Sequence, residues 1–173
     1  STRPRKDFSV QAVSRDDSPI TRPFSSATTR LSGQTQSLAL RGDAPEIRAR
    51  HIEVTPLIDA ADRYWGEMRY DNFDELPRID ADDTRPPVHI AASVERGAVS
   101  DERLRVASSR MVAVGNDTLL NPATRLAVDQ DFISSSINWM LNRERLIGVT
   151  PKRKQFFRIH LSEDQRRQIF QTT

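Results

Sequence analysis

The sequence predicts a single α/β domain whose sheet is mostly parallel. Three observations support this prediction of the fold class. A chain of 173 residues can bury a core of domain size. The apolar run "RMVAVGN" at 110–116 does not alternate with polar residues, and a helical pattern follows it at 129–146. Strands of parallel sheets are covered on both faces, so they are apolar without alternation. We therefore expect the run at 110–116 to lie inside such a sheet.

The composition excludes several classes of function. The 26 basic and 24 acidic residues are interspersed, so the chain lacks the basic stripe of a nucleic-acid-binding protein. The absence of cysteine excludes thiol nucleophiles, thiolate metal sites and disulfides. No apolar run approaches the roughly 18 residues of a membrane helix. Because the chain opens without methionine and stops within a helical pattern, we expect it to be a piece of a longer protein.

The first 109 residues are expected to form strands joined by long polar loops. Their serine and threonine density leaves disorder open for residues 1–17, and residues 18–109 are expected to be a variable strand and loop part. Pro56 should end or bend the third strand of this part. The patterns predict strands at residues 8–14, 35–40, 47–60 and 86–97. The acidic stretch at 71–83 lacks the alternating pattern of a calcium loop and is interpreted as a solvated loop.

Residues 110–173 are expected to form a strand, a helix, a strand and a second helix. Asp129 or Asp131 can cap the first helix, and Gly148 should end it. Its apolar face is predicted from residues spaced i, i+4, i+7 and i+8, with two aromatic residues widening it. These residues are Ile133, Ile137, Met140 and Leu141, with Phe132 and Trp139 beside them. The second helix should begin near Ser162.

A polar corner follows the apolar run at 110–116. It contains Gly115, Asn116, Asp117 and Asn121, and in α/β sheets ligands gather at strand ends of this kind. One glycine does not make a phosphate cradle, and a turn capped by Asp117 explains the same residues. We interpret the corner as a docking point for the helix, with Asn138 hydrogen-bonded from the helix to a loop. It is also the first place to search for a small ligand.

No residue set with catalytic spacing is present. His51, His89 and His160 each lack a second metal-type residue at i+2, i+3 or i+4, and no G-x-S-x-G motif is found. The sequence therefore predicts neither a metal nor a cofactor. One basic patch, Lys152, Arg153 and Lys154, precedes two phenylalanines and could contact phosphate on a lipid headgroup or a nucleic acid.

Three segments occur in a characteristic order: "RMVAVGNDTLLNP", "DQDFISSSINWMLNRERLIGVTPK" and "RIHLSEDQRRQIF". Together they resemble the C-terminal portion of the extracytoplasmic region in the GldG-like auxiliary proteins of ABC transporters, which are associated with gliding motility. The positions that match the family's motifs are Gly115, Asn116, Asp117, Asn121, Phe132, Asn138, Trp139, Leu146, Ile147, Pro151, Lys152, Leu161, Ser162 and Gln165. Looser matches lie upstream, from about Ser18 onward.

The resemblance implies a three-layer α/β fold with a mostly parallel sheet. This fold would be of the flavodoxin-like or class I glutamine-amidotransferase-like kind, without its nucleophile, and present here in a partial or small version. It also implies a domain on the extracytoplasmic side of a bacterial membrane, anchored by segments outside this chain. The implied partners are an ABC permease and an ATPase. Homodimer formation is left open.

The leading functional expectation is a non-catalytic binding or scaffolding domain of such a transport system. One alternative is a hydrolase or amidotransferase-like enzyme acting through Asp117 and a histidine, which requires His89 or His160 within hydrogen-bond reach of Asp117. A second alternative is a phosphate, lipid-headgroup or nucleic-acid binder acting through the basic patch. That binder would show steep salt dependence.

Overall fold

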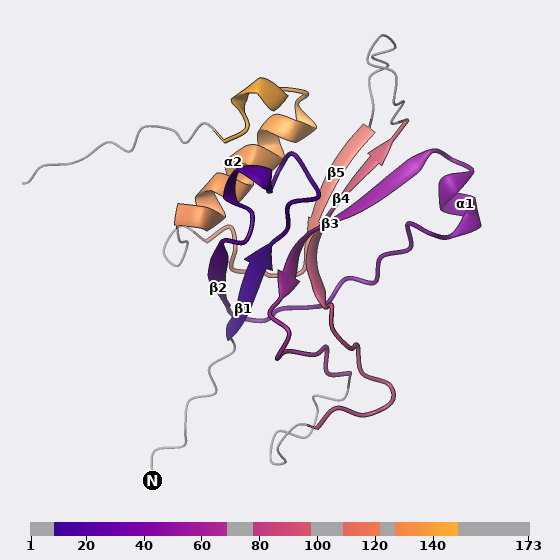
Figure 1. Ribbon diagram of the computed structural model, residues 1–173, viewed down its shortest axis with the longest axis vertical. Helices are drawn as coiled ribbons and strands as arrows, with labels where there is room; N and C mark the ends of the chain where they lie inside the picture. The colour runs from indigo at the N-terminus through magenta and orange to yellow at the C-terminus, as the bar shows by residue number, and fades with distance from the viewer. Residues whose placement is uncertain (1–8, 69–77, 98–108, 122–126, 149–173) are drawn as a thin grey trace, which may run out of the picture.

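A curled antiparallel sheet with one long helix packed against it forms the protein (Figure 1). The computed structural model describes residues 9–68, 78–97, 109–121 and 127–148. Its strands are β1 (Ser9–Ser14), β2 (Thr28–Ser32), β3 (Ile52–Ala60), β4 (His89–Arg96) and β5 (Ser109–Val114). The α-helices are α1 (Pro45–Arg48) and α2 (Ala127–Met140), and the 3-10 helices are η1 (Arg22–Phe24) and η2 (Glu144–Leu146).

The prediction of a mostly parallel, three-layer α/β sheet is wrong. The strand order is β2-β1-β3-β4-β5, and every neighbouring pair is antiparallel. The strand taken as central, β5, lies at one edge of the sheet. Its sequence is nearly all apolar although one side is open: Met111 is 54% exposed, while Val112 and Val114 pack against the core. The missing alternation therefore did not indicate burial on both faces.

The other strand predictions are partly confirmed. Three of the expected strands, at 8–14, 86–97 and 110–116, correspond to β1, β4 and β5. Of the segment 1–17, for which disorder was left open, Ser9–Ser14 form strand β1, and residues 1–8 lie outside the described residues. The expected strand at 35–40 is instead an extended segment, in which the Leu38 N–H donates to the His89 carbonyl at 2.8 Å. Strand β2 was not predicted.

The long strand expected at 47–60 begins five residues later than predicted. Pro45 starts the short helix α1, where its fixed φ suits the first helical position. The strand itself opens at Ile52, after His51 adopts a positive φ of 51° in the turn. Pro56 does not end the strand. The pairing of β3 with β4 is irregular between Pro56 and Asp59. This irregularity accommodates the proline, which has no N–H to donate to the neighbouring strand.

The predicted apolar face of helix α2 is partly confirmed: Phe132 and Trp139 are buried and Ile133 packs against the core, whereas Ile137, Met140 and Leu141 are exposed. Phe132 and Trp139 lie in the core, together with Leu57, Ile90 and other strand residues. By contrast, Ile137 is 47% exposed and Leu141 is 53% exposed. The helix is thus turned so that its two largest side chains are buried, with Ser135 and Ser136 between them allowing close approach.

The same helix connects the two edge strands of the sheet. Near its N-terminus the buried Asp129 accepts a hydrogen bond from the Thr29 hydroxyl of β2 at 2.8 Å. Near its C-terminus Arg110 of β5 donates to the Trp139 carbonyl at 2.7 Å and stacks 4.7 Å from the centroid of the indole. Arg110 also pairs with Glu95 and Glu144, each at 2.8 Å. The helix therefore spans the open side of the curled sheet.

Helix α2 ends earlier than predicted. Its last residue is Met140, and Asn142 follows in a left-handed conformation with φ 56°, which terminates the helix as glycine often does. The Asn138 amide donates to the Leu146 carbonyl at 3.4 Å and joins the helix to η2. The strand and second helix expected beyond Gly148 lie outside the described residues. Within the described part of the chain, no helix has the length and apolar character needed to cross a membrane.

Candidate functional site

The polar corner predicted after β5 is the place where the two edges of the sheet meet. The Asn116 amide nitrogen donates to the carbonyl of Ser32 at 3.0 Å, to that of Gln34 at 3.4 Å and to the Thr35 hydroxyl at 3.0 Å. Its amide oxygen accepts from the Thr118 backbone N–H at 3.1 Å. Ser32 ends β2 and Asn116 follows β5, so this one side chain joins opposite edges of the sheet.

Two glycines permit this close approach. A Cβ at Gly115 would overlap the backbone carbonyl of Gln36, whose own N–H donates to the Gly115 carbonyl at 2.6 Å. A Cβ at Gly33, which has φ +80°, would lie 2.6 Å from a Thr118 methyl. The Thr118 hydroxyl donates to the Ser32 carbonyl. Backbone and side chains are therefore packed where a bound ligand would need space.

The remaining corner residues, Asp117 and Asn121, are exposed. Asp117 is exposed and lies beside Gly33. Asn121 is exposed, and its backbone N–H closes a turn on the Thr118 carbonyl at 2.8 Å. Asn138 is not part of the corner, because it lies near Arg110 at the start of β5 and the corner follows the end of that strand. The structure thus brings together Gly115, Asn116, Asp117 and Asn121 only.

Within the described residues, no hydrogen bond joins His51 or His89 to Asp117. His89 faces Asp59 across β4 and β3, with its Nδ1 2.7 Å from the carboxylate. The other Asp59 oxygen accepts from Arg15 at 2.8 Å, and the hydrogen bonds that the Arg15 guanidinium donates to Asp59 and Asp17 raise its pKa above the usual value. His51 is exposed in the turn before β3. His160 and the basic patch of Lys152, Arg153 and Lys154 lie outside the described residues.

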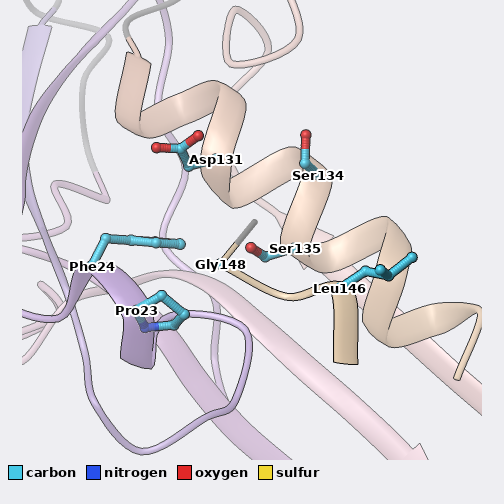
Figure 2. Close-up of a pocket in the computed structure, with 7 residues that line it drawn as sticks. All are labelled: Pro23, Phe24, Asp131, Ser134, Ser135, Leu146 and Gly148. Carbon is cyan, nitrogen blue, oxygen red and sulfur yellow. The ribbon is translucent and has the colours of Figure 1, made fainter. Parts of the chain in front are cut away.

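A groove that the sequence did not indicate runs between η1 and α2 (Figure 2). It has a volume of about 70 Å³ and is lined by Pro23, Phe24, Asp131, Ser134, Ser135, Leu146 and Gly148. Figure 2 shows the helix residues along one side, with Pro23 and Phe24 across from them and Gly148 between. Small-molecule pockets usually measure roughly 300–1,000 Å³, so this groove has room for one side chain rather than for a substrate.

The polar groups of the groove are not satisfied by the protein. Asp131 is half-buried, and its carboxylate makes no hydrogen bond or ion pair within the described residues. Ser135 is 3% exposed, and its hydroxyl likewise has no partner there. In Figure 2 this hydroxyl points into the space between α2 and Gly148. The fully buried side-chain atoms without a hydrogen-bond partner in the described part of the chain are instead the hydroxyls of Thr21 and Ser136.

The sequence carried only a faint signal for this groove. Asp131 was considered as a helix cap. The cap position lies before Ala127, so Asp131 stands well inside the helix, one turn before Ser135. An acid and a hydroxyl spaced i, i+4 lie on one helix face. That spacing was visible, but the proline and phenylalanine of η1 that complete the groove come from more than 100 residues away.

Comparison of the chain with protein-family models, with curated proteins and with solved structures found no match. Within the described residues, no group of three or more histidine, aspartate and glutamate side chains is arranged to hold a metal ion.

Proposed function

We propose that this chain is a non-catalytic binding or scaffolding domain that serves an ABC transport system as part of an auxiliary subunit. The domain stands on the extracytoplasmic side of a bacterial membrane, and its partners are the permease and the ATPase of the same system. The proposal combines two supports: the bonding of the polar corner, and the ordered motifs shared with GldG-like proteins.

The bonding of Asn116 is the observation that carries the non-catalytic part. A catalytic group must present an atom to its substrate at hydrogen-bond distance. At this corner the Asn116 nitrogen and oxygen, together with the Thr118 hydroxyl, are engaged with the protein itself. Asp117 remains exposed, and His89, one of the two histidines that the enzyme alternative requires, is paired with Asp59. The corner is thus suited to holding the sheet in shape rather than to chemistry.

The transport part of the proposal depends on the motifs alone. They run from Arg110 through the C-terminal part of the chain in the order found in GldG-like proteins. The parallel fold that the resemblance implied is not the fold of this chain, so the fold adds no support. The groove beside α2 suits a binding role, because it can accept a side chain from another protein.

Affinity purification tests this proposal. The parent protein, tagged and expressed in its own cells, should bring down an ABC permease and its ATPase after chemical cross-linking. A Trp139→Ala variant, in which the fold is damaged, is the control and should recover neither. Purified chain that shows hydrolase or amidase turnover abolished by Asp117→Ala would contradict the non-catalytic part. Recovery of other proteins without permease or ATPase would contradict the transport part.

A further inference from the structure

The outward face of helix α2 carries an apolar strip. Ile137, Leu141 and Leu146 are each about half exposed, and Met140 beside them is exposed as well. The aromatic side chains of the same helix lie in the core, so this strip is on the face turned away from the sheet. Residues three and four positions apart are neighbours on a helix surface, so Ile137, Met140 and Leu141 are contiguous. A contiguous exposed apolar patch is typical of a surface that contacts another molecule.

The charges at the two ends of this strip have opposite signs. Asp131 lies in the N-terminal half of α2, whereas Arg143 and Arg145 follow its C-terminal end. None of these three side chains makes a hydrogen bond or an ion pair within the described residues. Glu144, which lies between the two arginines, is paired with Arg110 at 2.8 Å. One end of the strip therefore has a negative charge without a partner, and the other end has two such positive charges.

This order of charges makes the strip complementary to a second copy of itself. Asp131 lies six residues before Ile137, and Arg143 lies six residues after it. Six helical residues span about 9 Å. A two-fold axis beside Ile137 therefore brings the acid of each copy next to the end of the other helix that carries the arginines. Two copies in parallel would instead place like charges together, which an interface avoids.

From these features we infer that the outward face of α2 is a dimer interface, and that its occupant is the same face of a second copy of this chain. The two helices run antiparallel about a two-fold axis, as in most homodimers, where one patch serves both subunits. Ile137 meets its counterpart at the axis, and the apolar side chains of Met140 and Leu141 pack around it. The Asp131 carboxylate accepts charge-assisted hydrogen bonds from the arginines of the second copy. The inference does not rest on the proposed transport role.

Sedimentation velocity of the full purified chain at increasing concentration tests the interface. One pair of helices buries less than the roughly 1,200–2,000 Å² of a stable interface, so we expect a dissociation constant on the order of 100 µM. This constant should rise with salt, because the terminal contacts are ionic. Ile137→Glu places two like charges at the axis and should raise the constant at least about tenfold. Met111→Glu, which changes an equally exposed apolar residue on β5, is the matched control and should dimerise as the parent does.

Charge reversal tests the antiparallel orientation. Asp131→Lys should weaken self-association at least about fivefold, and a chain with both Arg143→Glu and Arg145→Glu should do the same, because each places like charges together. A mixture of the two variants restores both opposite-charge contacts, so it should form heterodimers about as tightly as the parent chain dimerises. A mixture that associates no better than its separate components would exclude the antiparallel interface.

The lack of cysteine in the chain permits a second measurement. An Ile137→Cys chain should form an interchain disulfide under mild oxidation, because the two copies of this residue meet at the axis, whereas Met111→Cys should not. This comparison decides the matter if circular dichroism shows that Ile137→Glu does not fold. Equal cross-linking of the two cysteine variants would overturn the inference. A parent chain that remains monomeric up to about 1 mM would overturn it as well, since another occupant or solvent would then cover the face.

Discussion

The corner after β5 and the groove beside α2 contain similar polar side chains, but their hydrogen bonding is opposite. At the corner, the Asn116 amide makes three donor contacts and accepts from Thr118. At the groove, Asp131 and Ser135 have no partner within the described residues. The corner was conspicuous in the sequence and is part of the framework. The groove was inconspicuous, and its polar side chains make no contact that holds the described part of the fold together.

This difference in hydrogen bonding distinguishes polar residues that hold the sheet together from polar residues that do not. Folding satisfies buried polar groups wherever it can, because an unpaired group costs about 1–3 kcal/mol. A group left unpaired in the folded chain is consequently a better indicator of a ligand than a group that merely follows a strand. The predictions below test whether substitutions at the corner lower the free energy of unfolding and whether a substitution at the groove leaves it unchanged.

The largest expected effect is the loss of the helix anchor on which both regions depend. Trp139→Ala should lower the free energy of unfolding by about 3–5 kcal/mol, since it removes a buried indole together with its stacking on Arg110. Chemical denaturation measures this loss. Ile137→Ala, on the exposed face of the same helix, is the control and should cost less than about 1 kcal/mol. Similar losses for the two variants would mean that α2 is not clamped through its aromatic face.

Next in size is the effect of closing the space at the corner. Gly115→Ala should cost about 3 kcal/mol, because the new methyl group overlaps the Gln36 carbonyl. Gly97→Ala is its control: that glycine has φ +81° but nothing within 4 Å of the added Cβ, so only backbone strain of about 1 kcal/mol is expected. Thermal unfolding of both variants compares them. If Gly97→Ala were the more damaging change, the edges of the sheet would not be in contact at Gly115.

A smaller loss is expected when the corner keeps its shape but loses its amide. Asn116→Ala should cost about 2 kcal/mol, because the Ser32 carbonyl and the Thr35 hydroxyl lose their donor. Asp117→Ala, the exposed neighbour, should stay within about 0.5 kcal/mol of the parent. Denaturant midpoints of the two variants test this pair. A destabilised Asp117→Ala chain beside an unaffected Asn116→Ala chain would reverse the roles assigned to the corner.

The smallest effect is expected at the groove. Asp131→Asn should change the free energy of unfolding by no more than about 0.5 kcal/mol, because its carboxylate supports no contact within the described residues. The same denaturation experiment applies. A loss above about 1 kcal/mol would show that Asp131 is a structural residue like Asn116, and the contrast between the two regions would disappear.

Local patterns predicted the strands and the main helix better than they predicted their arrangement. The extended segments that form β1 and β4, the apolar β5 and the helix around Trp139 were all visible, because each depends on neighbouring residues. The pairing of β5 with β4 in antiparallel fashion was not, since a run such as "RMVAVG" is compatible with a central or an edge position. The contact between β5 and the helix, in which the Arg110 guanidinium stacks on the Trp139 ring, could likewise not be predicted from the local pattern.

The candidate site shows the same limit. The corner residues could be grouped from the sequence, as they follow one another along the chain. Whether Asn116 would face a ligand or the end of β2 depended on a contact with Ser32, more than 80 residues away. The buried face of α2 was predicted only in part for a related reason. Phe132, Ile133 and Trp139 do face the core, but helical period alone could not show that Ile137, Met140 and Leu141 would be left exposed.

The joining of both outer strands by one helix affects the behaviour of shorter chains. A chain that stopped before Ala127 would retain the sequences of all five strands but lose the Asp129 contact with β2 and the Trp139 contact with β5. Uncovered sheet margins are templates onto which strands of neighbouring molecules add. Such a truncated chain should therefore assemble into β-rich oligomers instead of merely unfolding more easily. We therefore expect α2 to limit aggregation of this protein as well as to contribute to its core.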